Sequence, residues 1–529
     1  MQRRSIAPIQ RSWPVRRVMR ERWLAILLCA LIAQIPFESR YTLLGISNLQ
    51  WTFIALAAAS TPLLFQNRKR LLHDRLIQCA ALFVGIQWLA AAYAPEFHAN
   101  TFKAAARFTA GALLLAICSI SSKQKLVQRA WAISATVAAV YALIAYTGFG
   151  MTALFRTEEF YIGQIQRLSG SFEYPNTAAA YFAMSLPIVW WSSLRTVVRA
   201  ISAFALWCAL ILTFSKGALV AAAIVLLARR KSSVPILATG AIAYVLLLPV
   251  QPYLWERLRG PVAQNPIGAE YNVAWTRLDQ QPATSDEVPL HIRNTGITTW
   301  HAAGWRSVAI GTRWWNPESQ KFLRLAPLIT KLPHDIAPGE TLDISTAIRT
   351  PEQSGRYILV LDLFSNNLDW FSQAGVIPLL LEANIRTSVH RSIGQADLKS
   401  FYDRGQTPGA LTASVARSSL WNAALLMFRA HPFGVGPDNF RLEYGKYLNA
   451  SHWDTDVHSN NLYLELLTGS GFLGLAAFGL MLAARHWDLQ APSLAAAIFL
   501  VHGVVDYFLM TTPLYFAFWI MLGNSGTDV

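Results

Sequence analysis

The sequence predicts an all-α polytopic membrane protein of about 12 transmembrane helices with one inserted extracytoplasmic β-sandwich of the immunoglobulin-like kind. Three observations lead to this fold class. Hydrophobic residues make up 53% of the 529 residues and charged residues only 14%, whereas an ordinary soluble domain has roughly 25% charged residues. Apolar runs recur along the chain at the length of membrane helices. Part of one long loop, residues 268–387 of the loop 251–457, instead alternates apolar and polar residues as β-strands do.

The apolar runs define the predicted membrane helices, since a helix needs about 20 mostly apolar residues to cross a bilayer. The predicted spans are residues 23–37, 49–65, 76–94, 104–120, 130–149, 177–194, 200–214, 215–228, 234–250, 460–484, 491–510 and 511–523. Lysine and arginine gather before the first span and then in every second connection. Because such residues mark the cytoplasmic side, both termini are predicted to be cytoplasmic and the loop 251–457 extracytoplasmic.

The net charge of +15 does not indicate a nucleic-acid partner. The loop 251–457 carries 19 Lys and Arg against 19 Asp and Glu, so the whole excess belongs to the membrane part and its flanks. All four cysteines, Cys29, Cys79, Cys118 and Cys208, lie in predicted spans. The outer loop therefore has no disulfide framework and no thiolate metal site.

The first part of the outer loop, residues about 268–387, reads as β structure. Alternating runs at residues 288–292, 307–315, 341–348, 357–364 and 376–385 are separated by turn signals such as Pro338-Gly339. Short strands at this spacing indicate an immunoglobulin-like sandwich. Its tryptophans fit either the core of a sandwich or an exposed platform that stacks on sugars. They are Trp275, Trp300, Trp305, Trp314, Trp315 and Trp370.

The second part of the outer loop, residues 388–457, changes character. Residues 397–404 and 411–429 are predicted to be helical, and a loop rich in glycine and proline follows at residues 431–440, before a further helix to Leu448. This segment is predicted to be amphipathic and to lie on the outer membrane surface. The domains are thus residues 1–250 (spans one to nine), 251–387 (β-sandwich), 388–457 (helical segment) and 458–529 (spans ten to twelve).

Residues capable of chemistry gather at the outer ends of the spans. Arg167, Lys216 and Arg417 are cations that could converge with His458 at one membrane face. Ionisable groups near hydrocarbon are costly, so they point to function. Cations at that depth suit an anionic lipid headgroup such as a diphosphate, and histidine suits proton transfer near neutral pH. A cationic cradle beside a base is what a displacement with a diphosphate leaving group requires.

Each of these residues also has a structural interpretation. An arginine or lysine at a span end can extend to lipid headgroups, and His458 can be an interfacial residue. His502 and Asp506 are spaced i, i+4 and can form a structural pair on one helix face, and Glu465 can form a structural hydrogen bond. No set of His, Cys and carboxylate residues has metal-ligand spacing, and no phosphate-binding glycine loop is present, so no metal or cofactor is expected.

Taken in order, these motifs resemble the O-antigen ligase / O-antigen polymerase family of bacterial membrane glycosyltransferases. The resemblance covers the spans and residues 388–457, but not the sandwich. The motifs are Arg167-x-Ser-Gly-x-Phe-x-x-Pro175-Asn176, Arg417-x-x-x-Trp421, His431-Pro-x-Gly-Val-Gly-Pro-x-Asn-Phe440, His458-x-Asn460-x-x-Tyr463-Leu-Glu465, Gly471-x-x-Gly474-Leu and His502-x-x-x-Asp506.

The resemblance implies an enzyme of the bacterial inner membrane that moves a glycan from a polyprenyl diphosphate to an acceptor hydroxyl on the outer face, without a metal and with inversion. It implies that His458 is the base and that Arg417 and Arg167 bind the diphosphate. Lys216 stands where the family usually has arginine, and it keeps the charge without the two-pronged fork. Supporting roles fall to Trp421, Asn460, Tyr463, Glu465, His502 and Asp506.

The acceptor stays open between a lipid, a growing glycan and a protein. A ligase is favoured over a repeat-unit polymerase and over a protein O-oligosaccharyltransferase, all of which share the motifs. A glycolipid transporter is the alternative outside enzymes. It would need charges along a path through the bundle, whereas mid-span positions here are apolar.

Overall fold

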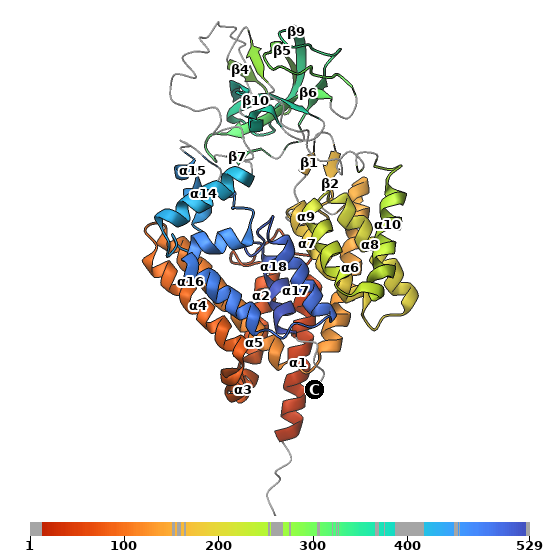
Figure 1. Cartoon of the computed structure of the whole chain (residues 1–529), viewed down its shortest axis with the longest axis vertical. Helices are drawn as coiled ribbons and strands as arrows, with labels where there is room; N and C mark the ends of the chain where they lie inside the picture. Colours follow the sequence, from red (N-terminus) through yellow and green to blue (C-terminus); the bar gives the residue numbers. More distant parts are fainter. Residues whose placement is uncertain are drawn as a thin grey trace, which may run out of the picture.

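The computed structural model shows a body of helices with a β-rich region at one end (Figure 1). It describes residues 13–150, 154–155, 160–162, 165–251, 254, 268–273, 277–303, 307–319, 321–323, 325, 327–365, 370–374, 376–386, 417–448, 453 and 455–524. The predicted helix at residues 397–404 and the first residues of the one at 411–429 lie outside this part of the chain. A mostly helical architecture with an all-β region is thus confirmed.

Each predicted span contains a helix. The helices before the β region are α1 (Trp13–Gln34), α2 (Asn48–Gln66), α3 (Arg68–His73), α4 (Arg75–Tyr93), α5 (His98–Ile120), α6 (Gln124–Ile144), α7 (Pro175–Trp190), α8 (Thr196–Leu212), α9 (Lys216–Leu227) and α10 (Val234–Leu247). Those after it are α14 (Arg417–Ala430), α15 (Phe440–Tyr447), α16 (Leu462–Ala484), α17 (Ala491–His502) and α18 (Thr512–Gly523).

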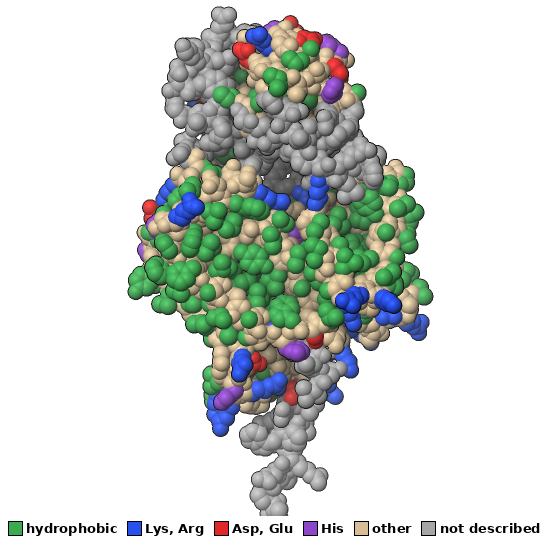
Figure 2. Space-filling model, in the orientation of Figure 1, with side chains coloured by type: hydrophobic (Ala, Val, Ile, Leu, Met, Phe, Trp, Pro, Cys, Tyr) green, Lys and Arg blue, Asp and Glu red, His purple; other side chains and the backbone are tan. Residues whose placement is uncertain are grey.

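Length and hydropathy support a membrane location for the helical body. In the described residues, α4, α5, α6 with its continuation to Phe149, and α16 are long and apolar enough to cross a bilayer, and α8, α9, α17 and α18 are shorter apolar helices. On the face shown in Figure 2, hydrophobic side chains cover the helical body, and Lys and Arg lie mainly above and below them. This belt fits a membrane protein. The count of twelve spans stays a prediction.

The helices pack around α7, whose residues from Thr177 to Val189 are all buried. A helix that is apolar all round belongs in the interior, and α7 accordingly contacts α6, α8, α9 and α17. The start of α7, the start of α16 and the end of α17 lie at the same end of the body, which is the end that faces the β region (Figure 1).

One predicted span differs from the structure. The run 491–510 is helical only to His502, where Gly503 ends α17. Residues 503–511 leave the helix because backbone groups of this segment bind the start of α16: Leu462 N donates to Gly503 O at 2.7 Å, and Asn461 Nδ2 donates to Val504 O at 2.8 Å. His502 and Asp506 therefore do not share a helix face, and the i, i+4 interpretation is wrong.

Helix α16 is kinked at a glycine of the Gly471-x-x-Gly474 motif. Gly471 has φ +66°, which favours glycine, and a Cβ there would lie 2.3 Å from the carbonyl oxygen of Pro432. The kink lets the loop before α15 lie against α16, where Val435 N donates to Thr468 O at 2.9 Å. That loop holds α14 and α15 beside the N-terminal half of α16.

The described residues of the β region form two sheets. One has the order β4-β11-β10-β6-β7 with β8 paired to β6, and the other has the order β3-β5-β9. The strands are β3 (Ala269–Asn272), β4 (Arg277–Gln280), β5 (Ser285–Asn294), β6 (Val308–Asn316), β7 (Lys321–Phe322), β8 (Ile329–Lys331), β9 (Thr341–Arg349), β10 (Gly355–Ser365) and β11 (Leu379–Ile385). All five predicted strands are present. The immunoglobulin-like class stays a prediction.

The tryptophans of this region belong mainly to its core. Trp300, Trp314 and Trp315 are buried, and both sheets contribute to one hydrophobic cluster that includes Val288, Trp314 and Leu361. Trp370 is half-buried beneath the guanidinium of Arg313, 3.9 Å from its ring centroid. Trp275 and Trp305 lie outside the described residues. The described tryptophans thus fit the core interpretation better than the sugar platform.

Candidate functional site

His458 lies three residues before the N-cap of α16 and is held by a carboxylate. Asn461 caps the helix by accepting hydrogen bonds from Tyr463 N and Leu464 N. This fixes the first turn, so that Glu465 reaches back: its Oε1 lies 3.0 Å from His458 Nδ1, and its Oε2 accepts from Ser459 N at 2.9 Å. With Nδ1 donating to the carboxylate, Nε2 is free to accept a proton, as in a histidine general base.

The surroundings of His458 change its acidity. Burial favours the neutral ring, but the charge and hydrogen bond of Glu465 and the charge of Asp438 outweigh burial and raise the pKa of His458 above 6.5. Asp438 Oδ1 lies 4.0 Å from His458 Nε2. Asp438 is itself bound by Arg441, whose Nε and Nη2 donate to its two oxygens at 3.1 and 2.9 Å. A proton taken up by His458 would therefore face two carboxylates.

A second cluster centres on Asp506. Asn176 Nδ2 donates to Asp506 Oδ2 at 2.7 Å, and Arg167 Nη2 donates to Asn176 Oδ1 at 2.6 Å. Arg167 Nε also donates to the carbonyl of Thr213 at 2.8 Å. Arg417 approaches the same carboxylate, with Nη2 3.9 Å from Asp506 Oδ2. The structure thus brings two of the three predicted cations, Arg167 and Arg417, around one carboxylate.

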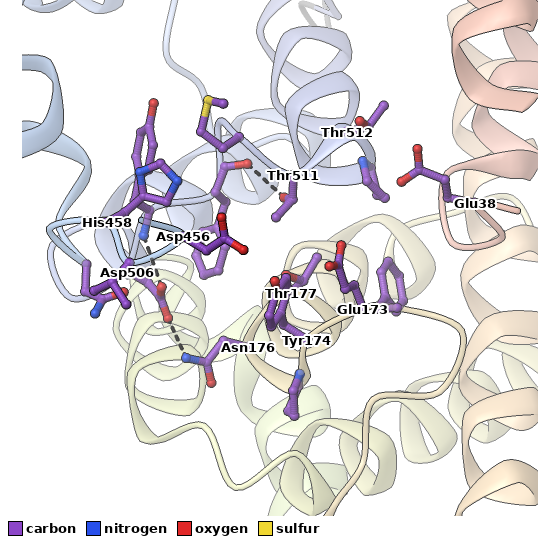
Figure 3. A pocket seen from close by; sticks show the side chains of 18 of the residues that line it. Glu38, Glu173, Tyr174, Asn176, Thr177, Asp456, His458, Asp506, Thr511 and Thr512 are labelled. Atoms are coloured by element: carbon purple, nitrogen blue, oxygen red, sulfur yellow. Dashed lines mark hydrogen bonds between the residues drawn. The ribbon is translucent and has the colours of Figure 1, made fainter. Parts of the chain in front are cut away.

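Both clusters meet at a cavity of about 530 Å³. In Figure 3, His458 and Asp506 lie on one side of this cavity and Glu38 lies opposite. Four carboxylates and two arginines are among the lining residues, which also include the predicted Asn460. The full set is Pro36, Glu38, Arg167, Ser171, Phe172, Glu173, Tyr174, Pro175, Asn176, Thr177, Arg441, Asp456, Val457, His458, Asn460, Asp506, Tyr507, Phe508, Met510, Thr511, Thr512 and Pro513.

Two predicted cations do not line this cavity. Arg417 is the first residue of α14, and its side chain is 49% exposed. Lys216 begins α9 and is half-buried. The next residue, Gly217, lies against His502, since a Cβ at Gly217 would be 3.2 Å from His502 Nε2. The expected cradle of three cations within one cavity is therefore only partly formed: Arg167 lines the cavity, and Arg417 adjoins it through Asp506.

The remaining predicted residues hold the site together. Tyr463 Oη donates to Leu500 O at 3.0 Å and links α16 to α17. His502 is buried beside the ring of Phe508, with the centroids 4.8 Å apart. Trp421 packs on the cluster formed by α14 and α15. In the part of the chain that the structure describes, the indole nitrogen of Trp421 and Nδ1 of His502 are buried without a hydrogen-bond partner.

The sequence analysis did not single out several residues of the site. Asp438 and Arg441 flank His458, Asn176 links Arg167 to Asp506, and the ring of Tyr507 lies 5.1 Å from that of His458. Asp438 and Asn176 lie in motifs noted above, so they could have been named from those motifs. Among the described residues, no group of three or more His, Cys, Asp and Glu side chains is placed to hold a metal ion.

Comparison with known proteins supports the resemblance. A family model described as O-antigen ligase matches residues 374–479, a segment that contains Arg417, His458 and Glu465. The chain therefore carries an O-antigen ligase family domain, and the resemblance to this family is confirmed. Such a domain and the apolar helices fit a membrane glycosyltransferase.

Two further comparisons add little. A search of curated proteins finds no match. Among solved structures, the chain is similar to the ASH / PapD-like domain of human CEP192 (PapD-like domain 7), with 14% identity and a TM-score of 0.15, over 24% of this chain and 93% of that chain. A score of this size does not establish a shared fold.

Proposed function

We propose that this protein is a bacterial inner-membrane glycosyltransferase that moves a glycan from a polyprenyl diphosphate to an acceptor hydroxyl on the outer face of the membrane. The observation that carries the proposal is the His458–Glu465 pair, which borders the cavity that also holds Arg167, Asn176 and Asp506. A partly buried histidine oriented by a carboxylate is suited to deprotonate a hydroxyl. The neighbouring carboxylates can bind hydroxyl groups of the substrates, and the neighbouring arginines can bind the diphosphate of the donor.

The proposed reaction is a single displacement. The acceptor oxygen attacks the anomeric carbon of the donor glycan, and its proton passes to Nε2 of His458. The bond between the anomeric carbon and the phosphate oxygen breaks, and the diphosphate leaves with the electron pair. Attack opposite the leaving group inverts the configuration. Glu465 and Asp438 then stabilise the imidazolium, because both carboxylates face the ring.

The two kinds of charge at the site fit the two substrates. The carboxylates that line the cavity can accept hydrogen bonds from sugar hydroxyls. Arg417 projects from α14 with half of its side chain exposed, so its guanidinium can bind the two phosphates in a forked geometry. Arg167 is the assisting cation beside Asp506. Lys216 precedes Gly217, which lies against His502, and would supply charge alone.

The placement of the site supports an outer location. It lies at the end of the helical body that faces the β region, whereas α3 lies at the opposite end (Figure 1). Helix α3 begins with Arg68-Lys69-Arg70, a cluster of the kind that marks the cytoplasmic side. We accordingly propose that both termini are cytoplasmic, that twelve helices cross the membrane and that the immunoglobulin-like β region is extracytoplasmic.

The acceptor separates the proposed ligase from a repeat-unit polymerase and from a protein O-oligosaccharyltransferase. The test uses the purified chain in liposomes with a polyprenyl-diphosphate oligosaccharide and, in parallel, a lipid, a glycan and a protein acceptor. We expect transfer to the lipid by the wild type and none by His458→Ala, with donor binding retained. His73→Ala, which changes an exposed histidine on α3, is the matched control and should keep wild-type transfer.

Two outcomes would contradict the proposal. Wild-type protein that transfers the glycan to none of the acceptors but moves intact donor across the bilayer would favour the glycolipid transporter. Equal transfer by His458→Ala and wild type would remove His458 from the mechanism. Transfer to a second glycan unit or to the protein would replace the ligase by the polymerase or the protein glycosylation enzyme.

A further inference from the structure

A second cavity of about 320 Å³ lies next to the proposed active site. Residues of α2, α5, α18 and the start of α15 line this second cavity. It shares Arg441, Met510 and Thr512 with the cavity of His458. Its lining residues are Gln50, Phe53, Asn100, Lys103, Ala104, Arg107, Ala110, Asp438, Arg441, Met510, Thr512, Tyr515 and Phe516. No residue named in the sequence analysis as a candidate site residue is among them.

This second cavity differs from the first in its charge. Its lining residues include three cations, Lys103, Arg107 and Arg441, and one carboxylate, Asp438. Both oxygens of Asp438 already accept hydrogen bonds from Arg441. Arg441 also donates through Nη2 to Asn100 Oδ1 at 2.9 Å and through Nη1 to Thr455 O at 2.9 Å. Among the described residues, neither Lys103 nor Arg107 donates a hydrogen bond to that carboxylate.

Arg107 is the cation that needs explanation. It lies one turn below Lys103 on α5, with its guanidinium carbon 4.8 Å from the centroid of the Tyr515 ring. Its Nη2 is buried and has no hydrogen-bond partner among the described residues. Within the same part of the chain, no carboxylate lies within 4.0 Å of the charged nitrogens of Arg107 or Lys103. A buried guanidinium nitrogen without a partner is costly, and an anion would remove that cost.

We propose that this cavity binds the phosphate group of an anionic lipid. Guanidinium and ammonium groups that converge on one space suit phosphate oxygens. The apolar lining residues Phe53, Ala104 and Phe516 suit the adjoining part of a lipid, and Lys103 is exposed at the rim. A soluble phosphate would use the cations and leave the apolar wall unexplained.

The position of the cavity gives the lipid a role, and this part rests on the proposed function. Arg441 forms a wall common to both cavities and binds Asp438, which faces His458. A lipid held by its phosphate at Arg107 would extend its headgroup past Arg441 toward the base. The lipid is then the acceptor, bound separately from the donor diphosphate near Arg417.

Binding is measured on the full chain, purified in an uncharged detergent. The probes are phosphatidic acid, the zwitterionic phosphatidylcholine and inorganic phosphate. We expect one equivalent of phosphatidic acid to bind and phosphatidylcholine not to compete. Affinity should fall about tenfold in Arg107→Gln and in Lys103→Gln, since each removes a charge-assisted hydrogen bond, and should be kept in Arg107→Lys. Lys123→Gln, at an exposed lysine before α6, is the matched control.

The outcomes separate this inference from the proposed function, because the readout does not require transfer. Equal affinity for phosphatidic acid in the wild type, Lys103→Gln and Arg107→Gln would overturn the lipid site. Inorganic phosphate that binds as tightly as phosphatidic acid, with the same loss in Arg107→Gln, would overturn the lipid and assign the cavity to a free phosphate. Lys103 is exposed, so its variant tests the site even where Arg107→Gln does not fold. A loss of transfer with binding kept would instead count against the function alone.

Discussion

The helical body and the β region each contain histidines paired with carboxylates, but the settings of these pairs differ. His458 Nδ1 lies 3.0 Å from Glu465, and the two side chains are 17% and 2% exposed. In the β region, His291 Nδ1 lies 2.6 Å from Asp343, and those side chains are 49% and 85% exposed. Both pairs are within hydrogen-bond distance, and the exposed pair is the closer one, so burial rather than distance distinguishes the pairs.

Burial decides what each pair can do. Around the exposed pair, water screens the charges, so the interaction contributes little. Around the buried pair, Glu465 has a second hydrogen bond from Ser459 N, and the ring of Tyr507 limits the movement of His458. The imidazole is held in one orientation beside a cavity. A histidine–carboxylate distance alone therefore does not identify a catalytic pair; the surrounding contacts do.

Replacing Glu465, the carboxylate of the buried pair, tests whether burial separates the two pairs. Of the substitutions in this section, it should lower transfer the most. Glu465→Gln keeps the size of the side chain but removes its charge. We expect the transfer rate at pH 8 to fall about 100-fold, the lower part of the range for a positioned general base. In Asp343→Asn, the matched change in the exposed pair, the rate should stay within about twofold, given the small value of surface pairs. Equal losses in the two variants would remove the distinction between the pairs.

Arg417→Lys asks whether forked geometry matters at the site as well as charge. The substitution keeps one positive charge beside Asp506 but removes the planar fork. We expect transfer to fall about tenfold, equivalent to the loss of one charge-assisted hydrogen bond to phosphate. The measurement is the rate at saturating acceptor as the donor concentration varies. Wild-type rates in Arg417→Lys would show that Arg417 is structural.

Deleting the β region, residues 268–387, with a short linker should have the smallest effect on chemistry. His458, Glu465, Asp506 and Arg167 all lie outside it, and its hydrophobic cluster is separate from that of the helices. We expect the helical body to fold, as judged by its elution as a single species, and some transfer to survive. Complete loss of transfer from a folded deletion protein would place a necessary group in the β region.

The sequence predicted the elements well because local patterns determine them. Apolar runs and alternating stretches gave the helices and the five main strands. The end of α17 was missed because residues 503–510 are apolar apart from Asp506, while their hydrogen bonds with the start of α16 are not local. Because α17 ends at His502, the prediction that His502 and Asp506 share a helix face was wrong for the same reason.

The candidate site was predicted in part. His458 lies just before the N-cap of α16 and Glu465 lies in the first turn of that helix, so their contact follows from where one helix starts. The partners of Asp506 and Arg441 come from far along the chain: Asn176 is 330 residues from Asp506, and Asn100 is 341 residues from Arg441. Such contacts depend on how helices pack, which neither hydropathy nor charge along one chain determines.

The pH dependence of transfer tests whether His458 is the base. We propose that neutral His458 is the base. Burial lowers the pKa of its ring, but Glu465 and Asp438 raise this pKa by more than burial lowers it. The wild-type rate should therefore fall as the pH drops through a value above 6.5. In Glu465→Gln, one of the two charges that raise the pKa of His458 is gone, so burial lowers this pKa and the inflection should move to lower pH. The same inflection in both proteins, or none in the wild type, would contradict the account.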